Sequence, residues 1–148
     1  MPETKRLRVV VDTNNLVKSV LTKESSSNNR RLVEIWKAGK FQIIASEKTL
    51  RELEIVLDYP RVKKRLGESE EGKELLDLLR GNAVIVGGQA KVSADLGDPK
   101  DEMFLACALE GKADYVISAD NHLLDLGECE GIPIISVGRF VEILKGQS

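Results

Sequence analysis

Cysteine, aromatic residues and long apolar runs are all scarce in this chain of 148 residues. The two cysteines, Cys107 and Cys129, form neither a CxxC pair nor a zinc-ligand framework, which favours a reducing, cytoplasmic setting. Aromatic residues make up 4% of the chain, too few to support a platform for stacking bases. No apolar run approaches the ~20 residues that span a bilayer, and no signal peptide is visible in the opening MPETKRLRVVVDTNN. We therefore expect no membrane association.

The chain also lacks an excess of positive charge. Lys and Arg total 22, Asp and Glu total 24, and the net charge is −2. A protein that grips nucleic acid through its overall field is normally basic, so any such contact here must be local. The densest basic run is formed by Arg61, Lys63, Lys64 and Arg65. A second run contains Arg30, Arg31, Lys37 and Lys40. Each run is equally compatible with a solvated helical face.

Short apolar strand patterns alternate with helical patterns along the whole sequence. Strands are predicted at 7–11, 41–45, 83–86, 115–118 and 133–135. Helices are predicted from 13 to Leu21, from a cap at Asn29 to Gly39, from a cap at Ser46 to Leu57, at 61–66, 69–80 and 99–110 (ended by Gly111), from 121, and at 137–144. This alternation predicts one α/β domain over residues 1–148, with a parallel sheet and helices on both of its faces.

Acidic residues follow several of these strands. Asp12 ends the first strand, in VVVDTNN, and Asp120 follows the fourth, in YVISAD. Glu52 lies about two turns into the helix after the second strand, and Asp101 lies in the first turn of the helix that begins at Pro99. Ligands of such folds bind beyond the carboxyl ends of the strands. The four acids are therefore expected to converge on one cleft.

Clustered carboxylates require either raised pKa values or a cation. Two carboxylates about 4 Å apart repel by roughly 4 kcal/mol at an effective dielectric constant near 20. No histidine cluster accompanies these acids, because His122 is the only histidine of the chain. Oxygen ligands alone favour Mg²⁺ or Mn²⁺ over Zn²⁺. Such an ion can activate a water molecule and stabilise charge on a phosphoryl oxygen.

Each acid also has a purely structural interpretation. Asp12 could be a turn or N-cap residue, completed by Thr13 and Asn14. Asp98, followed by Pro99, is typical of a helix N-cap. Asp120 could cap the next helix, and Glu52 could lie on a solvated face. In this register, however, the four together favour a functional cluster.

At these residues the chain resembles the PIN-domain family, particularly its VapC-like branch of toxin components. The matching segments are VVVDTNNLVKSVL, IIASEKTLRELEIVL, DPKDEMFLACALEGKADYVISAD and IPIISVGRFVEIL, in the order of the family. The resemblance implies a three-layer α/β/α sandwich with a central parallel sheet. It also implies a metal-dependent endoribonuclease with an acidic active site.

The resemblance assigns roles to individual residues. It implies that Asp12, Glu52, Asp101 and Asp120 are the catalytic acids, and that Asp12, Asp101 and Asp120 are metal ligands, with Thr13, Asn14 and Ser118 supporting them. Two positions depart from the family pattern: Asn15 replaces an apolar residue, and His122 stands where many members carry another acid. A second metal ion would therefore lack one ligand, which Asp98 could replace. His122 is either a surface residue or a contact to a substrate phosphate.

Alternative functions differ in the motifs that they require. A haloacid-dehalogenase-like phosphatase needs DxDxT after the first strand, whereas this chain has DTN, and P-loop chemistry needs a GxxxxGK[ST] motif that is missing. A non-catalytic scaffold that kept the fold remains the alternative to a ribonuclease acting on RNA. The resemblance further implies a homodimer and, for a toxin, a cognate antitoxin protein.

Overall fold

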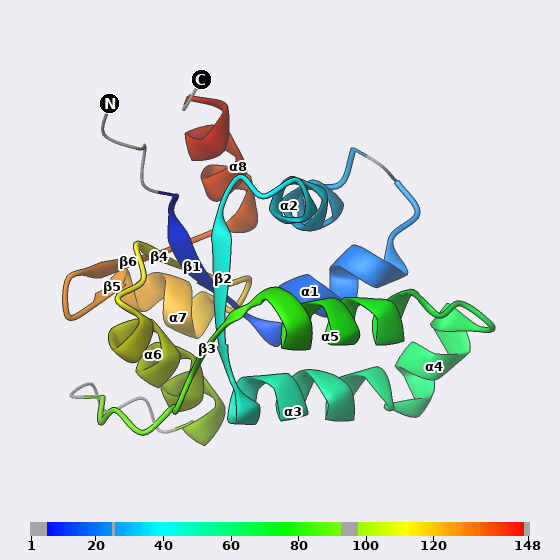
Figure 1. Cartoon of the computed structure of the whole chain (residues 1–148), viewed down its shortest axis with the longest axis horizontal. Coiled ribbons are helices and arrows are strands. Elements are labelled where there is room, and N and C mark those ends of the chain that lie inside the picture. The colour runs from blue at the N-terminus through cyan, green and yellow to red at the C-terminus, as the bar shows by residue number, and fades with distance from the viewer. Residues whose placement is uncertain (1–5, 25, 93–97, 147–148) are drawn as a thin grey trace.

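The computed structural model describes residues 6–24, 26–92 and 98–146. Its centre is a sheet of strands in the order β3-β2-β1-β4-β6-β5 (Figure 1). The strands are β1 (Arg8–Val11), β2 (Gln42–Ser46), β3 (Val84–Val86), β4 (Tyr115–Ile117), β5 (Glu128–Cys129) and β6 (Ile132–Ile135). All neighbouring strands pair in parallel except β5, which is antiparallel to β6. The predicted parallel sheet is confirmed, and β5 is an addition at its edge.

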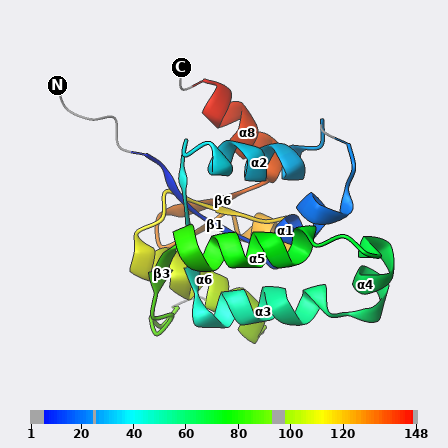
Figure 2. The same ribbon diagram turned by 45° about the vertical axis from the view of Figure 1, so that its right-hand side comes forward.

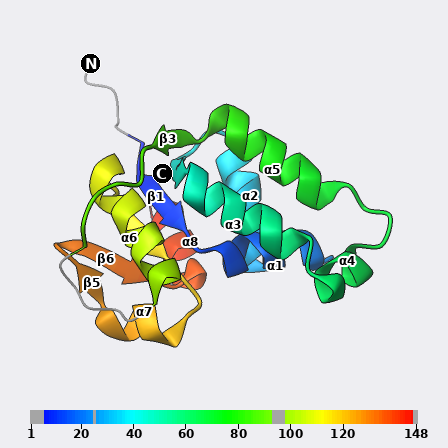
Figure 3. The ribbon, with the colours of Figure 1, turned by 90° about the horizontal axis from the view of Figure 1, so that it is seen from below.

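Eight helices connect and cover the strands within the described residues. They are α1 (Thr13–Leu21), α2 (Asn28–Lys37), α3 (Glu47–Leu57), α4 (Pro60–Leu66), α5 (Glu71–Asn82), α6 (Pro99–Gly111), α7 (Asn121–Leu126) and α8 (Val137–Lys145). In Figure 2, α3 and α5 run side by side and α4 joins them at one end. Figure 3 shows α6 lying next to α3, whereas α7 lies farther from the α3–α5 pair.

The alternation of buried side chains along the strands creates two apolar clusters, one on each face of the sheet. Val9 and Val11 of β1 pack with α1, α2, α3, α5 and α8, whereas Val10 packs with α6 and α7. Because successive side chains of a strand point to opposite faces, one buried strand serves both clusters. The three-layer α/β/α sandwich is therefore confirmed.

Three local predictions were wrong. The N-cap of α2 is Ser27 rather than Asn29, because the helix begins at Asn28. Gly111 does not end α6 but is its last residue, and Lys112 forms the C-cap in the left-handed conformation. The strand β5 was missed because two residues at a tight turn give no period-2 pattern.

Two local predictions were correct. Ser46 caps α3, since its hydroxyl accepts from the Thr49 amide (3.2 Å) and the Thr49 hydroxyl accepts from the Ser46 amide (3.0 Å). Cys107 is fully buried, as expected for a core residue. Among the described residues, no helix is long and apolar enough to cross a membrane.

Candidate active site

The four predicted acids line one cleft of about 280 Å³, which we call the acid cleft. Asp12 lies at the end of β1, Glu52 on α3, Asp101 on α6 and Asp120 in the segment after β4. A backbone hydrogen bond from the Asp12 amide to the Ile117 carbonyl (2.9 Å) ties the ends of β1 and β4 together. The parallel register thus brings acids that are distant in sequence to one edge of the sheet, as predicted.

Ser118 links two of these acids. Its fully buried hydroxyl donates to Oδ2 of Asp12 (2.9 Å) and accepts from the backbone amide of Asp120 (3.0 Å). The other Asp12 oxygen, Oδ1, accepts from the amide of Asn14 (3.3 Å). The Asp12 carboxylate is therefore held in place from both sides, and only 8% of the residue is exposed.

Three of the aspartates also act as helix N-caps. Asp12 caps α1, Asp98 caps α6 by accepting from the Lys100 amide (2.9 Å), and Asp120 caps α7 by accepting from the His122 amide (2.9 Å). The interpretation of Asp12, Asp98 and Asp120 as helix N-caps is therefore correct. A carboxylate has about four lone-pair sites, so capping leaves capacity for a further ligand.

Burial and mutual repulsion raise the pKa of two carboxyl groups in the acid cleft. Burial is the main cause of the raised pKa of Asp12, and the hydrogen bonds from Ser118 and Asn14 oppose it. Asp101 is 6% exposed. Burial raises its pKa, and the charges of Asp120, Asp98 and Asp12 raise it further. No hydrogen bond from the described residues offsets these effects at Asp101.

The chemistry of the acid cleft fits a hard divalent cation. Its donors are carboxylates, and a cation among them would relieve the repulsion that acts on Asp101. The Thr13 hydroxyl also lines the cleft, is buried, and has no hydrogen-bond partner among the described residues. A buried hydroxyl of this kind normally has a partner, which a water molecule or ligand in the cleft would supply.

The carboxylates do not, however, form a ready-made ligand group. Within residues 6–24, 26–92 and 98–146, no three Asp, Glu, His or Cys side chains are grouped so that they could hold a metal ion. Several of them engage separate donors instead, and Oε1 of Glu52 pairs with the Lys100 ammonium at 3.2 Å. Metal binding would therefore require side chains of the cleft to turn toward a shared ion.

The remaining predicted residues divide by position. Asn14, Asp98 and Arg61 line the acid cleft. Lys63 pairs with Asp58 on the surface (3.4 Å), and Lys64 and Arg65 are exposed on α4 without lining the cleft. His122 is also exposed. In the second basic run, Arg30 pairs with Glu71 (3.5 Å) and Lys37 with Glu34 (3.8 Å).

Sequence reasoning missed two polar residues of the acid cleft. Lys100 and Tyr59 both line it, and Lys100 contributes its only lysine among the described lining residues. The sequence could have indicated Lys100, because this residue lies between Pro99 and Asp101, at the start of a helix that was already assigned to the site. Tyr59 gives no signal, because it precedes Pro60 in the short stretch between two predicted helices, where the pair is typical of a helix break.

Comparison with known proteins agrees with this fold. The family model described as "PIN domain" matches residues 8–122. A search of curated proteins found no match. One similar solved structure is PAE2754 from Pyrobaculum aerophilum, with 15% identity and a TM-score of 0.62, covering 99% of this chain and 100% of that one. Another is VapBC2 from Rickettsia felis bound to a DNA fragment from its promoter, with 14% identity, a TM-score of 0.55, and coverage of 86% and 97%.

Proposed function

The chain belongs to the PIN-domain family, and from this membership and its acid cleft we propose that it is a metal-dependent endoribonuclease. The observation that carries the proposal is the convergence of Asp12, Glu52, Asp101 and Asp120, from four elements, on one cleft. The repulsion among them is a cost for the fold unless the cleft is used to hold a cation. Hydrolysis of a phosphodiester bond is the reaction that such an ion best supports.

In this proposal, Asp12, Asp101 and Asp120 hold Mg²⁺ or Mn²⁺, directly or through water. The ion supplies a Lewis acid and a water molecule of lowered pKa, so no protein nucleophile is needed. Ser118 and Asn14 fix the orientation of the Asp12 carboxylate by hydrogen bonding. Thr13 offers to the cleft a hydroxyl that has no hydrogen-bond partner in the part of the chain that the structure describes. Glu52 completes the site or orients the attacking water, once Lys100 releases its carboxylate.

The test is cleavage of a mixed set of single-stranded and structured RNAs in Mg²⁺ or Mn²⁺, with Asp12→Asn beside the wild type. We expect the wild type to cleave and Asp12→Asn to lose cleavage by at least about 100-fold, because the ion loses a charged ligand. Asp125→Asn is the matched control, since this exposed residue of α7 does not line the acid cleft. Metal-dependent cleavage by Asp12→Asn near the wild-type rate would overturn the assignment.

We extend the proposal to a toxin of a toxin–antitoxin pair, with an antitoxin protein as partner. The support is the VapC-like sequence pattern together with the structural likeness to VapBC2, a protein solved on promoter DNA. The homodimer implied by the resemblance stays a prediction, which sedimentation of the purified chain tests. If calorimetry detects no Mn²⁺ binding and no RNA is cleaved, the non-catalytic scaffold becomes the better account.

A further inference from the structure

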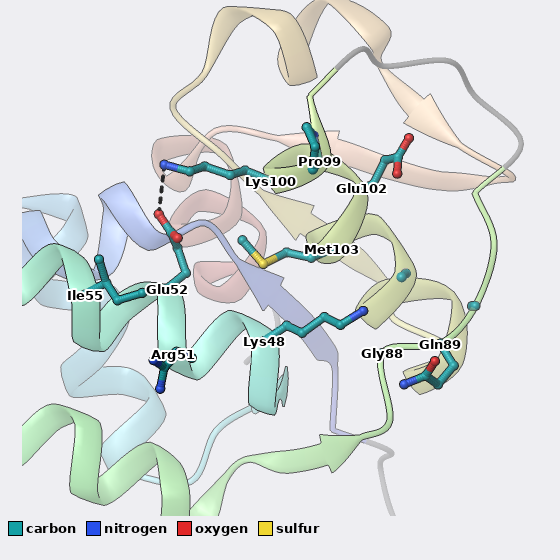
Figure 4. A pocket seen from close by; sticks show the side chains of 12 residues that line it. Lys48, Arg51, Glu52, Ile55, Gly88, Gln89, Pro99, Lys100, Glu102 and Met103 are labelled. Carbon is teal, nitrogen blue, oxygen red and sulfur yellow. Dashed lines mark ion pairs between the residues drawn. The ribbon is translucent and has the colours of Figure 1, made fainter.

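A second cavity, of about 530 Å³, lies beside the acid cleft between α3 and α6 (Figure 4). We call it the α3–α6 groove. Residues 88–90, which follow β3, complete its lining. Glu52 and Lys100 line both cavities, so their ion pair stands where the groove meets the acid cleft. A ligand that fills one cavity can therefore continue into the other.

The two cavities differ in charge. Among the residues that the structure describes, five acids and two basic residues line the acid cleft. The groove instead carries Lys48 and Arg51 from α3 and Lys100 from α6, with Glu52 and Glu102 as the acids of its described lining. Glu52 already pairs with Lys100. Lys48 and Arg51 are exposed and form no ion pair with any described residue, and Figure 4 shows Lys48 extending toward the side of α6.

Apolar side chains line the same groove as these cations. Ile55 is 42% exposed, and Met103 faces the same groove from α6. A surface that alternates cations with apolar contacts suits a single nucleic-acid strand, which presents phosphates on one side and unpaired bases on the other. A duplex keeps its bases paired and stacked, so their faces could not contact Ile55 and Met103.

The spacing along α3 connects the groove to the cleavage centre. Lys48 and Glu52 are four residues apart, which is about 6 Å along a helix axis. Arg51 directly precedes Glu52 in the sequence. Lys48 therefore lies about one helical turn from Glu52, and Arg51 is its neighbour in sequence, so both are close to the one acid that lines both cavities.

We propose that the α3–α6 groove binds the backbone of a single-stranded RNA whose scissile phosphate lies in the acid cleft, with Lys48 and Arg51 contacting the flanking phosphates. This inference rests on the proposed function and adds to it the path of the substrate. Ile55 and Met103 contact the bases of the same strand. Lys100 lies where the two cavities meet, and it leaves its ion pair with Glu52 to bind a phosphate when the RNA strand enters.

The first experiment measures binding of a fluorescein-labelled, single-stranded RNA 12-mer by anisotropy, without divalent ions, over a series of salt concentrations. The test variant is Lys48→Ala/Arg51→Ala. The control is Arg139→Ala/Lys145→Ala, which removes the same charge from exposed residues of α8, at the end of the molecule opposite α3 (Figure 1). All four lysine and arginine side chains are exposed, so the variants should fold, and their melting temperatures check this.

We expect the test variant to bind about 10-fold more weakly and to reduce the slope of log K against log salt by about 1.4, since each phosphate on a single strand contributes about 0.7. The control should stay within about twofold of the wild type, because general attraction is screened beyond ~10 Å. Equal affinities of the test variant and the wild type would overturn the groove as an RNA site.

The second experiment separates the groove from the cleavage centre. With Mn²⁺, we compare hydrolysis of RNA with hydrolysis of bis(p-nitrophenyl) phosphate, a small diester that has no flanking phosphates. The test variant should raise KM for RNA about 10-fold and leave hydrolysis of the small diester unchanged. Equal losses on both substrates would overturn the groove assignment, because the defect would then lie in the acid cleft.

The two proposals fail in different ways. If the wild type and the test variant cleave RNA equally well, the groove assignment is overturned and the ribonuclease proposal is unaffected. A wild type that hydrolyses neither substrate overturns the ribonuclease proposal, and the anisotropy result then decides the groove alone.

Discussion

At Asp101, burial and three neighbouring carboxylates act in the same direction. Each raises the pKa above its ordinary value of 3.8, so the folded state binds a proton at this carboxyl more tightly than the unfolded state does. The Asp101 carboxyl therefore adds to the free energy of unfolding below pH 3.8. This contribution is lost as the pH rises through the raised pKa of the folded state. At neutral pH, without metal, the charged Asp101 opposes folding.

Asp101→Asn should consequently raise the melting temperature at pH 7 in the absence of divalent ions. A gain on the order of 1 kcal/mol corresponds to about 2–4 °C in a chain of this size. The difference from the wild type should vanish at pH 3 and below, where the carboxyl is protonated in both states. Calorimetric scans across pH measure it, with Asp125→Asn as the exposed control. A lower melting temperature for Asp101→Asn at pH 7 would contradict the argument.

Asp12, Asp101 and Asp120 were predictable because each follows a short buried strand or lies in the first turn of a helix, whereas Glu52 lies about two turns into α3. VVVD and YVISAD place Asp12 and Asp120 at the carboxyl ends of β1 and β4, and parallel pairing brings those ends together. The Glu52–Lys100 pair was not predictable, because no sequence pattern states how far α3 stands from α6. The same applies to the α3–α6 groove, whose existence depends on helix packing.

At the scale of elements, the contact between α6 and β2 depends on the absence of a side chain. A Cβ at Gly111 would lie 2.7 Å from Cδ1 and Cγ2 of Ile44, closer than packed atoms tolerate. The last turn of α6 therefore approaches the sheet in a way that only glycine permits. The sequence suggested instead that Gly111 stops the helix, because glycine is common just past helix ends. Packing, rather than helix termination, explains the residue.

Gly111→Ala should destabilise the protein by about 1–3 kcal/mol, as insertion of a methyl group into a packed core does. Gly81→Ala is the matched control, because Gly81 lies within α5 and nothing stands within 4 Å of its added Cβ. Alanine should stabilise that helix by roughly 0.5–1 kcal/mol. Urea denaturation of both variants gives the two free energies of unfolding. If both variants gain stability, the close approach of α6 to Ile44 is not a constraint.

At the scale of the whole molecule, the central strands join the two apolar clusters. Val9 and Val11 face one cluster and Val10 faces the other, and β2 repeats the pattern with Ile43 and Ile44. If the central strands unfolded, the apolar side chains of both clusters would be exposed to water. The interpretation of residues 1–148 as one domain therefore predicts that both layers unfold in a single cooperative step.

The chain carries a natural reporter for each layer. Trp36, its only tryptophan, is buried in the cluster of α2, whereas the free thiols of Cys107 and Cys129 are buried in the cluster of α6 and α7. Tryptophan fluorescence and thiol labelling should thus give the same urea midpoint within error. A pulse of thiol reagent at each urea concentration reports the accessible fraction. A midpoint for exposure of the Cys107 thiol well below that for Trp36 would show that α6, and with it Asp98 and Asp101, detaches before the other layer, so that the acid cleft could open without global unfolding.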